Sequence, residues 1–242
     1  MLQTGKFPAN YLAFDTSTDV MSIALTDGAR TWQHVGPGGA KASSTMIPAI
    51  LALLVEASMV LGDLQAIAFG RGPGSFTGLR TACAVAQGLA FGANSGASVQ
   101  VLPIDTLLTV AEEALLPRES PLITALLDAR MDEMYVQRFA CHQGVLTKLN
   151  DCELIRPEAL VPEPGVLYAG NVFGVYRDRL PEGLNSLTCL PTATAMLRLA
   201  PRLAANGHCV AAAQALPLYV RDKVAQTTKE REQIKALKPQ TV

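Results

Sequence analysis

Residues 70–80 read GRGPGSFTGLR, which places four glycines and one proline between an apolar run and a segment rich in alanine. The apolar run, residues 64–69, has the length and the flanking glycine of a buried strand, and residues 81–93 have the composition of a helix. The stretch therefore predicts a tight strand-to-helix junction. Because the first N–H groups of a helix lack internal partners, Ser75 or Thr77 is expected to cap some of them, which leaves others for an anion or a partner.

The loop matches neither of the two common phosphate-binding patterns. A P-loop requires Lys and then Ser or Thr after its last glycine, whereas Gly78 is followed by Leu79 and Arg80. The spacing of Gly72, Gly74 and Gly78 is one residue longer than the dinucleotide-binding pattern allows. The chemistry of the loop alone favours a structural turn, with a phosphate site as the alternative.

Two β-hairpin patterns organise the rest of the chain. The first pairs residues 11–14 with 20–26, and the second pairs residues 122–127 with 134–140, about 110 residues later. Strand and helix patterns follow each hairpin. The sequence therefore predicts an α/β fold of two related lobes, each with a mixed sheet flanked by helices.

The boundary between the lobes is expected just after a predicted helix at residues 105–116. Residues 117–120, PRES, form a short polar connection. We therefore expect an N-terminal lobe at residues 1–116, with the glycine-rich loop, and a C-terminal lobe at residues 117–242. The second lobe ends in a basic tail at residues 221–238, which is interpreted as a solvated segment, with an RNA contact as the alternative.

Composition and charge restrict the classes of function. The chain has 242 residues, of which 49% are hydrophobic, and a net charge of -1, so a large core is expected and tight nonspecific nucleic-acid binding is not. Its five cysteines contain no C-x-x-C pair and its three histidines no His-x-x-x-His pair, so reduced thiols and no metal site are predicted. No signal peptide or membrane span is recognisable. These features predict a cytoplasmic protein without membrane contact.

Two predicted helices, residues 46–61 and 81–93, carry almost no polar side chains. Glu56 and Ser58 are the only polar residues of the first, and the second contains only a threonine and a glutamine. A helix that is apolar all round must be covered on more than one side, and a small lobe does not easily supply both covers. We therefore expect one face to pack on the sheet and another to bind a second chain. The alternative is that later parts of this chain cover both faces.

The residues expected at this interface are apolar side chains of the two helices. Each large side chain left in water would forfeit about 1.5–3 kcal/mol, and the small residues of the second helix would let a partner helix approach closely. The set comprises Met46, Ile50, Leu53, Ala82, Val85, Ala86 and Leu89.

The glycine-rich loop and five other segments together resemble the TsaB family of bacterial proteins, also called YeaZ. The other segments are AFDTST at 13–18, VAQGLAFG at 85–92, DARMDEMY at 128–135, AGN at 169–171 and PLYVRDKVA at 217–225. The resemblance spans nearly the whole chain. It implies a non-catalytic partner of TsaD that activates TsaD as a heterodimer in making threonylcarbamoyladenosine on tRNA, with TsaE as a third subunit. The complex would then contact the tRNA. A third possibility, which follows from the apolar helices, is that they pair with a second copy of this chain when TsaD is absent.

The duplicated hairpin is also similar to the start of each lobe in actin-like and sugar-kinase-like ATPases, where the first turn lies near phosphate. The corresponding nucleotide-cleft candidates here are Asp15, Thr16, Ser17, Gly72, Gly74 and Ser75. TsaD relatives carry a metal-binding histidine pair at the start of the first helix, where this chain has Ala42, which argues against a metal. The chain is thus expected to require no cofactor, with ATP or ADP at the complex or at a shared interface. An independent ATP-hydrolysing enzyme is the alternative function.

Both hairpin turns carry acidic residues, and each turn has more than one possible role. Asp15 either accepts N–H bonds in an Asx-type turn or holds a metal-bound water, and the turn role is favoured. The second turn contains Asp128, Arg130, Asp132 and Glu133, which we interpret as a solvated hairpin tip with local ion pairs.

Overall fold

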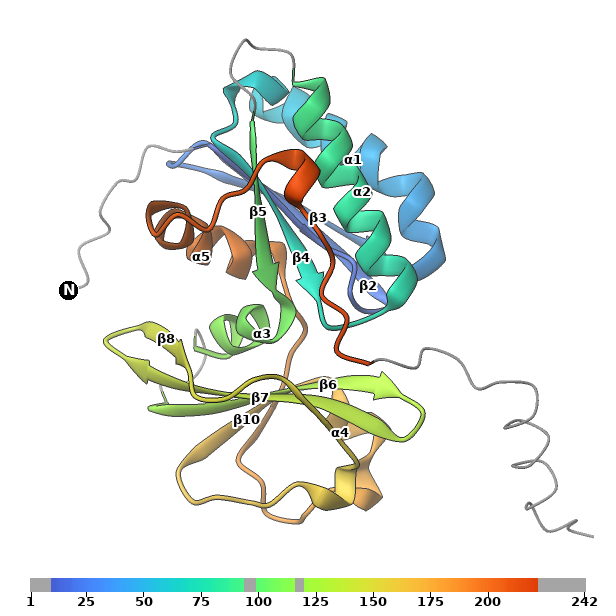
Figure 1. Cartoon of the computed structure of the whole chain (residues 1–242), viewed down its shortest axis with the longest axis vertical. Coiled ribbons are helices and arrows are strands. Elements are labelled where there is room, and N and C mark those ends of the chain that lie inside the picture. Colours follow the sequence, from blue (N-terminus) through green and yellow to red (C-terminus); the bar gives the residue numbers. More distant parts are fainter. Residues whose placement is uncertain (1–9, 94–98, 116–119, 222–242) are drawn as a thin grey trace, which may run out of the picture.

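A computed structural model of the chain describes residues 10–93, 99–115 and 120–221. Two mixed β-sheets form two lobes, one above the other in Figure 1. The first sheet has the strand order β3-β2-β1-β4-β5, with β1 antiparallel to β2 and parallel to β4. Its strands are β1 (Tyr11–Asp15), β2 (Val20–Thr26), β3 (Thr31–Pro37), β4 (Ala66–Gly72) and β5 (Gln100–Asp105).

The second sheet repeats this arrangement. Its order is β11-β10-β6-β7-β8, with β6 antiparallel to β7 and parallel to β10, and β9 pairs with β7. Its strands are β6 (Leu122–Arg130), β7 (Glu133–His142), β8 (Val145–Lys148), β9 (Glu153–Ile155), β10 (Val166–Gly170) and β11 (Ser186–Thr188). Each lobe therefore starts with a hairpin and adds parallel strands on the same side, which confirms the predicted pair of related α/β lobes.

The two faces of the first sheet are buried by different helices. Leu12 and Phe14 of β1 point into a core with α1 (Ala42–Ala57) and α2 (Phe76–Gly92). Tyr11 and Ala13, which alternate with them, belong to a second core with α3 (Thr106–Leu115) and α5 (Ala193–Ala205). This second core also contains Ile123 and Phe139 of the second sheet, so α3 and α5 connect the lobes (Figure 1).

The outer face of the second sheet covers a smaller core with α4 (Val172–Val175), in which Leu126, Met134 and Tyr176 are buried. Five short 3-10 helices connect the longer elements in the described part of the chain. They are η1 (Gly39–Lys41), η2 (Leu61–Asp63), η3 (Pro157–Ala159), η4 (Arg177–Arg179) and η5 (Ala212–Gln214).

The structure corrects the predicted extent of the second lobe. Helix α5 packs on β1 and β2 of the first sheet, and Val210 forms a bridge with Val101 of β5. Ala212 and Ala215 lie in the core beneath α1 and α2. The chain thus returns to the first lobe after β11, so residues 117–242 do not form one continuous lobe.

The helix boundaries also differ from those expected. Helix α1 ends at Ala57, where Ser58 adopts a left-handed conformation, and α2 begins at Phe76, five residues before the predicted start. Ser75 is the N-cap of α2 and its side chain accepts a hydrogen bond from the Gly78 N–H, as predicted. The glycine-rich loop is therefore shorter than its sequence pattern, because its last five residues already belong to the helix.

Candidate functional site

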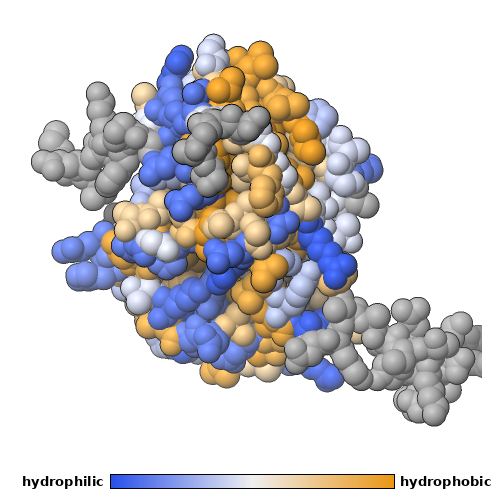
Figure 2. All heavy atoms as spheres, turned by 45° about the horizontal axis from the view of Figure 1, so that its top comes forward, coloured by the Kyte–Doolittle hydropathy of each residue, from blue (hydrophilic) through white to orange (hydrophobic). Residues whose placement is uncertain are grey.

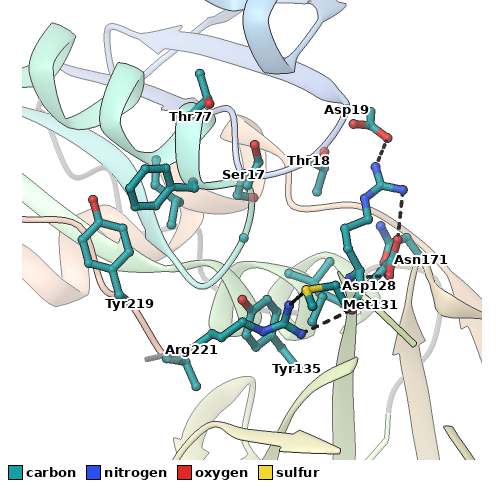
Figure 3. A pocket seen from close by; sticks show the side chains of 18 of the residues that line it. Ser17, Thr18, Asp19, Thr77, Asp128, Met131, Tyr135, Asn171, Tyr219 and Arg221 are labelled. Carbon is teal, nitrogen blue, oxygen red and sulfur yellow. Dashed lines mark hydrogen bonds and ion pairs between the residues drawn. The ribbon is translucent and has the colours of Figure 1, made fainter. Parts of the chain in front are cut away.

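A cavity of about 500 Å³ lies between the two lobes (Figure 3). Its first wall comes from the β1–β2 turn and the start of α2, and its second wall from the β6–β7 turn and the residues after β10. Residues 218–221, near the end of the described chain, contribute a third wall. The cavity occupies the cleft in which the nucleotide candidates were expected.

The glycines of the loop allow it to pack against the β1–β2 turn. The Ser75 N–H donates to the Ser17 carbonyl oxygen at 2.7 Å, and the Thr16 hydroxyl donates to the Gly78 carbonyl oxygen at 2.8 Å. A Cβ atom on Gly78 would overlap the Thr16 carbonyl oxygen, and one on Gly74 would lie 2.6 Å from Ser17. These glycines therefore serve close approach between two loops of the same chain.

The C-terminal part of the chain fills the other side of the loop. The Leu218 N–H donates to the Arg71 carbonyl oxygen at 2.6 Å. A Cβ atom on Gly72 would lie 2.5 Å from the Leu218 carbonyl oxygen. The space beside Gly72 is thus occupied by the chain itself.

Asp15 has the structural role that the sequence favoured. Its Oδ1 accepts hydrogen bonds from the Ser17 N–H at 2.8 Å and from the Ser17 hydroxyl at 2.6 Å, which confirms the Asx-type turn. Its Oδ2 has no hydrogen-bond partner among the described residues and packs against Gly70. Burial raises the pKa of Asp15 to about 6, against the effect of the two bonds from Ser17.

The six nucleotide-cleft candidates separate into two groups. Ser17, Gly74 and Ser75 line the cavity. Asp15, Thr16 and Gly72 are buried behind the cavity wall and do not line it. Asp15 ends β1, Thr16 follows it and Gly72 ends β4, and all three are buried at these strand ends.

The tip of the β6–β7 turn is exposed and has a local ion pair, as the sequence predicted, but the turn also pairs with distant segments. Arg130 pairs with Asp128 of its own turn at 3.2 Å, but also with Asp19 of the first lobe at 2.6 Å. Glu133 pairs with Arg221, which follows it by 88 residues. The turn therefore makes ion pairs that cross between the lobes, because the fold brings distant segments to it.

The charged side chains that line the cavity balance one another. Two carboxylates, Asp19 and Asp128, and two guanidinium groups, Arg130 and Arg221, line the cavity, and their formal charges cancel. Both arginines already pair with carboxylates of the chain. No three His, Cys, Asp or Glu side chains gather in a metal-binding group within the described ranges. A bound polyphosphate would have to break existing ion pairs to gain a cation.

The predicted interface residues are for the most part buried inside this chain. Their side chains pack between the helices and the first sheet, in the same core as Phe14 and Phe69. The prediction is therefore wrong for Met46, Ile50, Leu53, Ala82 and Ala86. Val85 and Leu89 are half-buried.

The opposite side of the same helices is apolar and exposed. On α1, Ile47, Leu51 and Val55 follow one another at four-residue spacing and are 42%, 48% and 78% exposed. On α2, Phe91 is 71% exposed, and Ala84 and Gly88 are exposed one turn apart. Figure 2 shows hydrophobic residues gathered at the end of the molecule where Figure 1 places α1 and α2.

We call this surface the outer helix face and define it as Ile47, Leu51, Val55, Ala84, Gly88 and Phe91. An added Cβ atom at Gly88 would meet no atom within 4 Å, so the surface is open at that position. The alternative that other parts of the chain cover both sides of the helices does not hold for the described residues. Contiguous exposed apolar surface of this kind marks interaction sites in monomeric proteins.

Comparison with known proteins identifies the family. A family model described as TsaD, tRNA N6-adenosine threonylcarbamoyltransferase, matches residues 37–229. The protein named tRNA threonylcarbamoyladenosine biosynthesis protein TsaB from Haemophilus influenzae is 33% identical over 88% of this chain and 94% of its own length. The chain belongs to the TsaB family.

Further relatives support the same assignment. The TsaB protein of Escherichia coli K12 is 30% identical over 88% of this TsaB-family chain and 95% of its own length. YeaZ from Pseudomonas aeruginosa is 35% identical in sequence, and its structure superimposes with a TM-score of 0.78. The match covers 88% of this chain and 100% of the YeaZ chain. The fold and the family thus agree with the resemblance seen in the sequence.

Among the described residues, no helix has both the length and the hydropathy that a bilayer crossing requires. The basic tail lies outside the described residues, apart from Arg221. The RNA contact considered for the tail stays a prediction.

Proposed function

We propose that this chain is a non-catalytic subunit that binds TsaD through its outer helix face and activates TsaD in threonylcarbamoyladenosine synthesis on tRNA. The observation that carries the proposal is the exposed apolar surface on α1 and α2 of a chain whose relatives are named for this biosynthesis. In this proposal the protein is cytoplasmic, and TsaE and tRNA are reached through the complex.

The exposed side chains favour another helical surface as the partner. Ala84 and Gly88 are small exposed residues of α2, and Phe91 of α2 and Leu51 of α1 are large exposed apolar residues. Small residues let two helices approach closely, and each large apolar side chain that becomes buried contributes about 1.5–3 kcal/mol. A second copy of this chain would fit by the same reasoning when TsaD is absent.

The proposal assigns no nucleotide to this chain. The loop glycines pack on the chain itself, and the cavity has no guanidinium group that is free of a carboxylate partner among its described residues. ATP or ADP would then act elsewhere in the complex, at TsaD, at TsaE or at a shared interface.

Reconstitution from purified subunits tests the proposal. The chain, TsaD and TsaE of one organism are incubated with tRNA, ATP and the threonylcarbamoyl donor, and modified tRNA is measured with each protein omitted in turn. We expect loss of modification without this chain, although TsaD is present, and no ATP hydrolysis by this chain alone. Full modification without this chain would refute the proposal.

The independent ATP-hydrolysing enzyme makes a different prediction. Under this alternative, the isolated chain hydrolyses ATP. Thr77 is exposed in the wall of the cavity, so Thr77→Ala should reduce the hydrolysis rate without unfolding the protein. Contaminating activity would not respond to this substitution.

A further inference from the structure

The last described segment of the chain crosses from the first lobe to the second along the cavity. Residues 215–221 run from beside α2 toward the lower lobe, in red in Figure 1. At the upper end, the Ala215 carbonyl oxygen accepts bonds from the Gln87 amide at 2.9 Å and from the Cys83 thiol at 3.2 Å. The Leu218 N–H then bonds to the Arg71 carbonyl oxygen at 2.6 Å. The segment is thus fixed to α2 and to the end of β4.

An aromatic contact holds the middle of the segment at the glycine-rich loop. The rings of Tyr219 and Phe76 have centroids 5.3 Å apart and are tilted by 37°. The Arg80 guanidinium lies 3.8 Å from the Phe76 centroid, and its Nε donates to the Tyr219 hydroxyl oxygen at 3.0 Å. Such ring and cation contacts stabilise the structure beyond the free energy that comes from the buried apolar area.

The lower end of the segment is anchored in the second lobe. The Arg221 guanidinium donates to the Glu133 carboxylate and to the Arg130 carbonyl oxygen, the latter at 3.3 Å. Another of its nitrogens lies 2.9 Å from the Met131 sulfur (Figure 3). Only 14% of the Arg221 side chain is exposed, so solvent screens this pair less than a surface ion pair.

Two further ion pairs cross between the lobes at other places. Arg130 of the β6–β7 turn reaches Asp19, and Lys148 of β8 reaches Asp105 at the end of β5. Asp105 also accepts a bond from Arg71, the residue whose carbonyl oxygen binds Leu218. The segment and the Arg130–Asp19 pair lie at the cavity, whereas the Lys148–Asp105 pair connects the lobes outside its lining.

We propose that residues 215–221 form a C-terminal strap that holds the two lobes at a fixed angle and closes one side of the cavity. The strap contacts both lobes, as a ligand bound between them would. The strap adds to the shared core with α3 and α5, and it predicts that the β6–β7 wall of the cavity becomes more mobile when the strap is released. This inference goes beyond the proposed function, because it concerns the isolated chain and is independent of any partner.

Hydrogen–deuterium exchange with mass spectrometry tests the strap on the full-length chain. The variant Tyr219→Ala/Arg221→Ala removes the aromatic contact and the lower anchor. We expect exchange in residues 216–221 and in the β6–β7 turn to become at least tenfold faster, while exchange in β1 and β6 stays the same. Arg138→Ala is the matched control, because it removes an ion pair with Glu163 that lies within the second lobe.

A second variant keeps the test independent of folding. Glu133→Gln removes only the charge that Arg221 binds, and we expect the same regions to exchange faster by a smaller factor. Unchanged exchange in both variants would overturn the strap, and so would equal acceleration in the strap, β1 and β6. The latter result would show that these residues unfold together with the core and do not act as a separate bridge.

Discussion

The inter-lobe cavity and the outer helix face differ in how far their side chains already have partners within the chain. In the cavity, Arg130 and Arg221 are paired with carboxylates of the chain, and Gly78 is packed against the carbonyl of Thr16. On the outer helix face, Val55 and Phe91 are more than two-thirds exposed. The outer helix face therefore has more interaction free energy to gain from a partner than the cavity has. Position in a fold is therefore a weaker guide to function than the interactions that a surface still lacks.

The largest expected effect is the loss of partner binding when charge is placed on the outer helix face. In Leu51→Asp/Phe91→Asp, two carboxylates would have to be desolvated in an apolar interface, so the affinity for TsaD should fall at least 100-fold. Sedimentation velocity of the mixed proteins measures it. Val161→Asp is the control, because Val161 is 72% exposed but lies in the second lobe. Equal loss of binding in the control would show that the outer helix face is not the interface.

Two glycines of α2 contrast the packed loop with the open helix surface. Gly78→Ala would drive a Cβ atom into the Thr16 backbone and should destabilise the chain by about 3 kcal/mol or more. Gly88→Ala meets no atom within 4 Å and should stabilise the isolated chain by about 1 kcal/mol through helix propensity. Urea unfolding measures both values. Changes of the same sign would contradict the difference between the two positions.

Substitutions at two neighbouring residues of α1 compare the core with the outer helix face. Ile50 is fully buried, so Ile50→Ala should cost about 2–5 kcal/mol of unfolding free energy. Leu51 is 48% exposed, so Leu51→Ala should change it by no more than about 0.5 kcal/mol. Thermal and urea unfolding of the isolated chain provide the comparison. A large effect of Leu51→Ala would mean that part of this chain covers the outer helix face in solution.

The buried carboxyl of Asp15 should make the stability depend on pH. Its pKa is raised to about 6 in the folded chain, whereas an unfolded Asp titrates near 3.9. The folded state therefore holds the proton more tightly, and this stabilisation is complete below about pH 4 and is lost as the pH rises through 6. Two pKa units correspond to about 2.7 kcal/mol.

Urea unfolding of the wild type and of Asp15→Asn between pH 4 and 7 isolates this contribution, because other groups cancel in the difference. We expect the stability of the wild type relative to the variant to fall by about 2–3 kcal/mol over this range. A constant difference would show that Asp15 is not buried as a titrating group.

Local sequence patterns predicted the parts of the fold that depend on neighbouring residues. The alternation in the two hairpins, the strand before the glycine-rich loop and the Ser75 cap all arise from contacts within a few positions. The path of α5 back to the first sheet was not predictable, because its apolar stripe fits either lobe. The ion pair of Arg221 with Glu133 was missed because the two residues lie 88 positions apart in the sequence.

The candidate sites were harder to predict because burial depends on the assembled core. The stretch 46–57 of α1 carries apolar residues on nearly all sides, so no stripe in the sequence distinguished Ile50, which is buried, from Leu51, which is exposed. Acidic Asp15 follows a strand in the same way as a cleft residue would, and only the packing of Gly70 against it reveals that it is interior. The four-residue spacing of Ile47, Leu51 and Val55 was a signal for the outer helix face, but Ile50 and Leu54 offer the same spacing.

Hydroxyl-radical footprinting of the chain with and without TsaD compares the two surfaces in one measurement. Phe91 on the outer helix face is 71% exposed and Tyr219 at the cavity is 44% exposed, so both side chains should be oxidised in the isolated chain. On addition of TsaD, we expect oxidation of Phe91 to fall severalfold while that of Tyr219 stays unchanged. Protection of Tyr219 with Phe91 still reactive would contradict the assignment of the outer helix face as the binding surface.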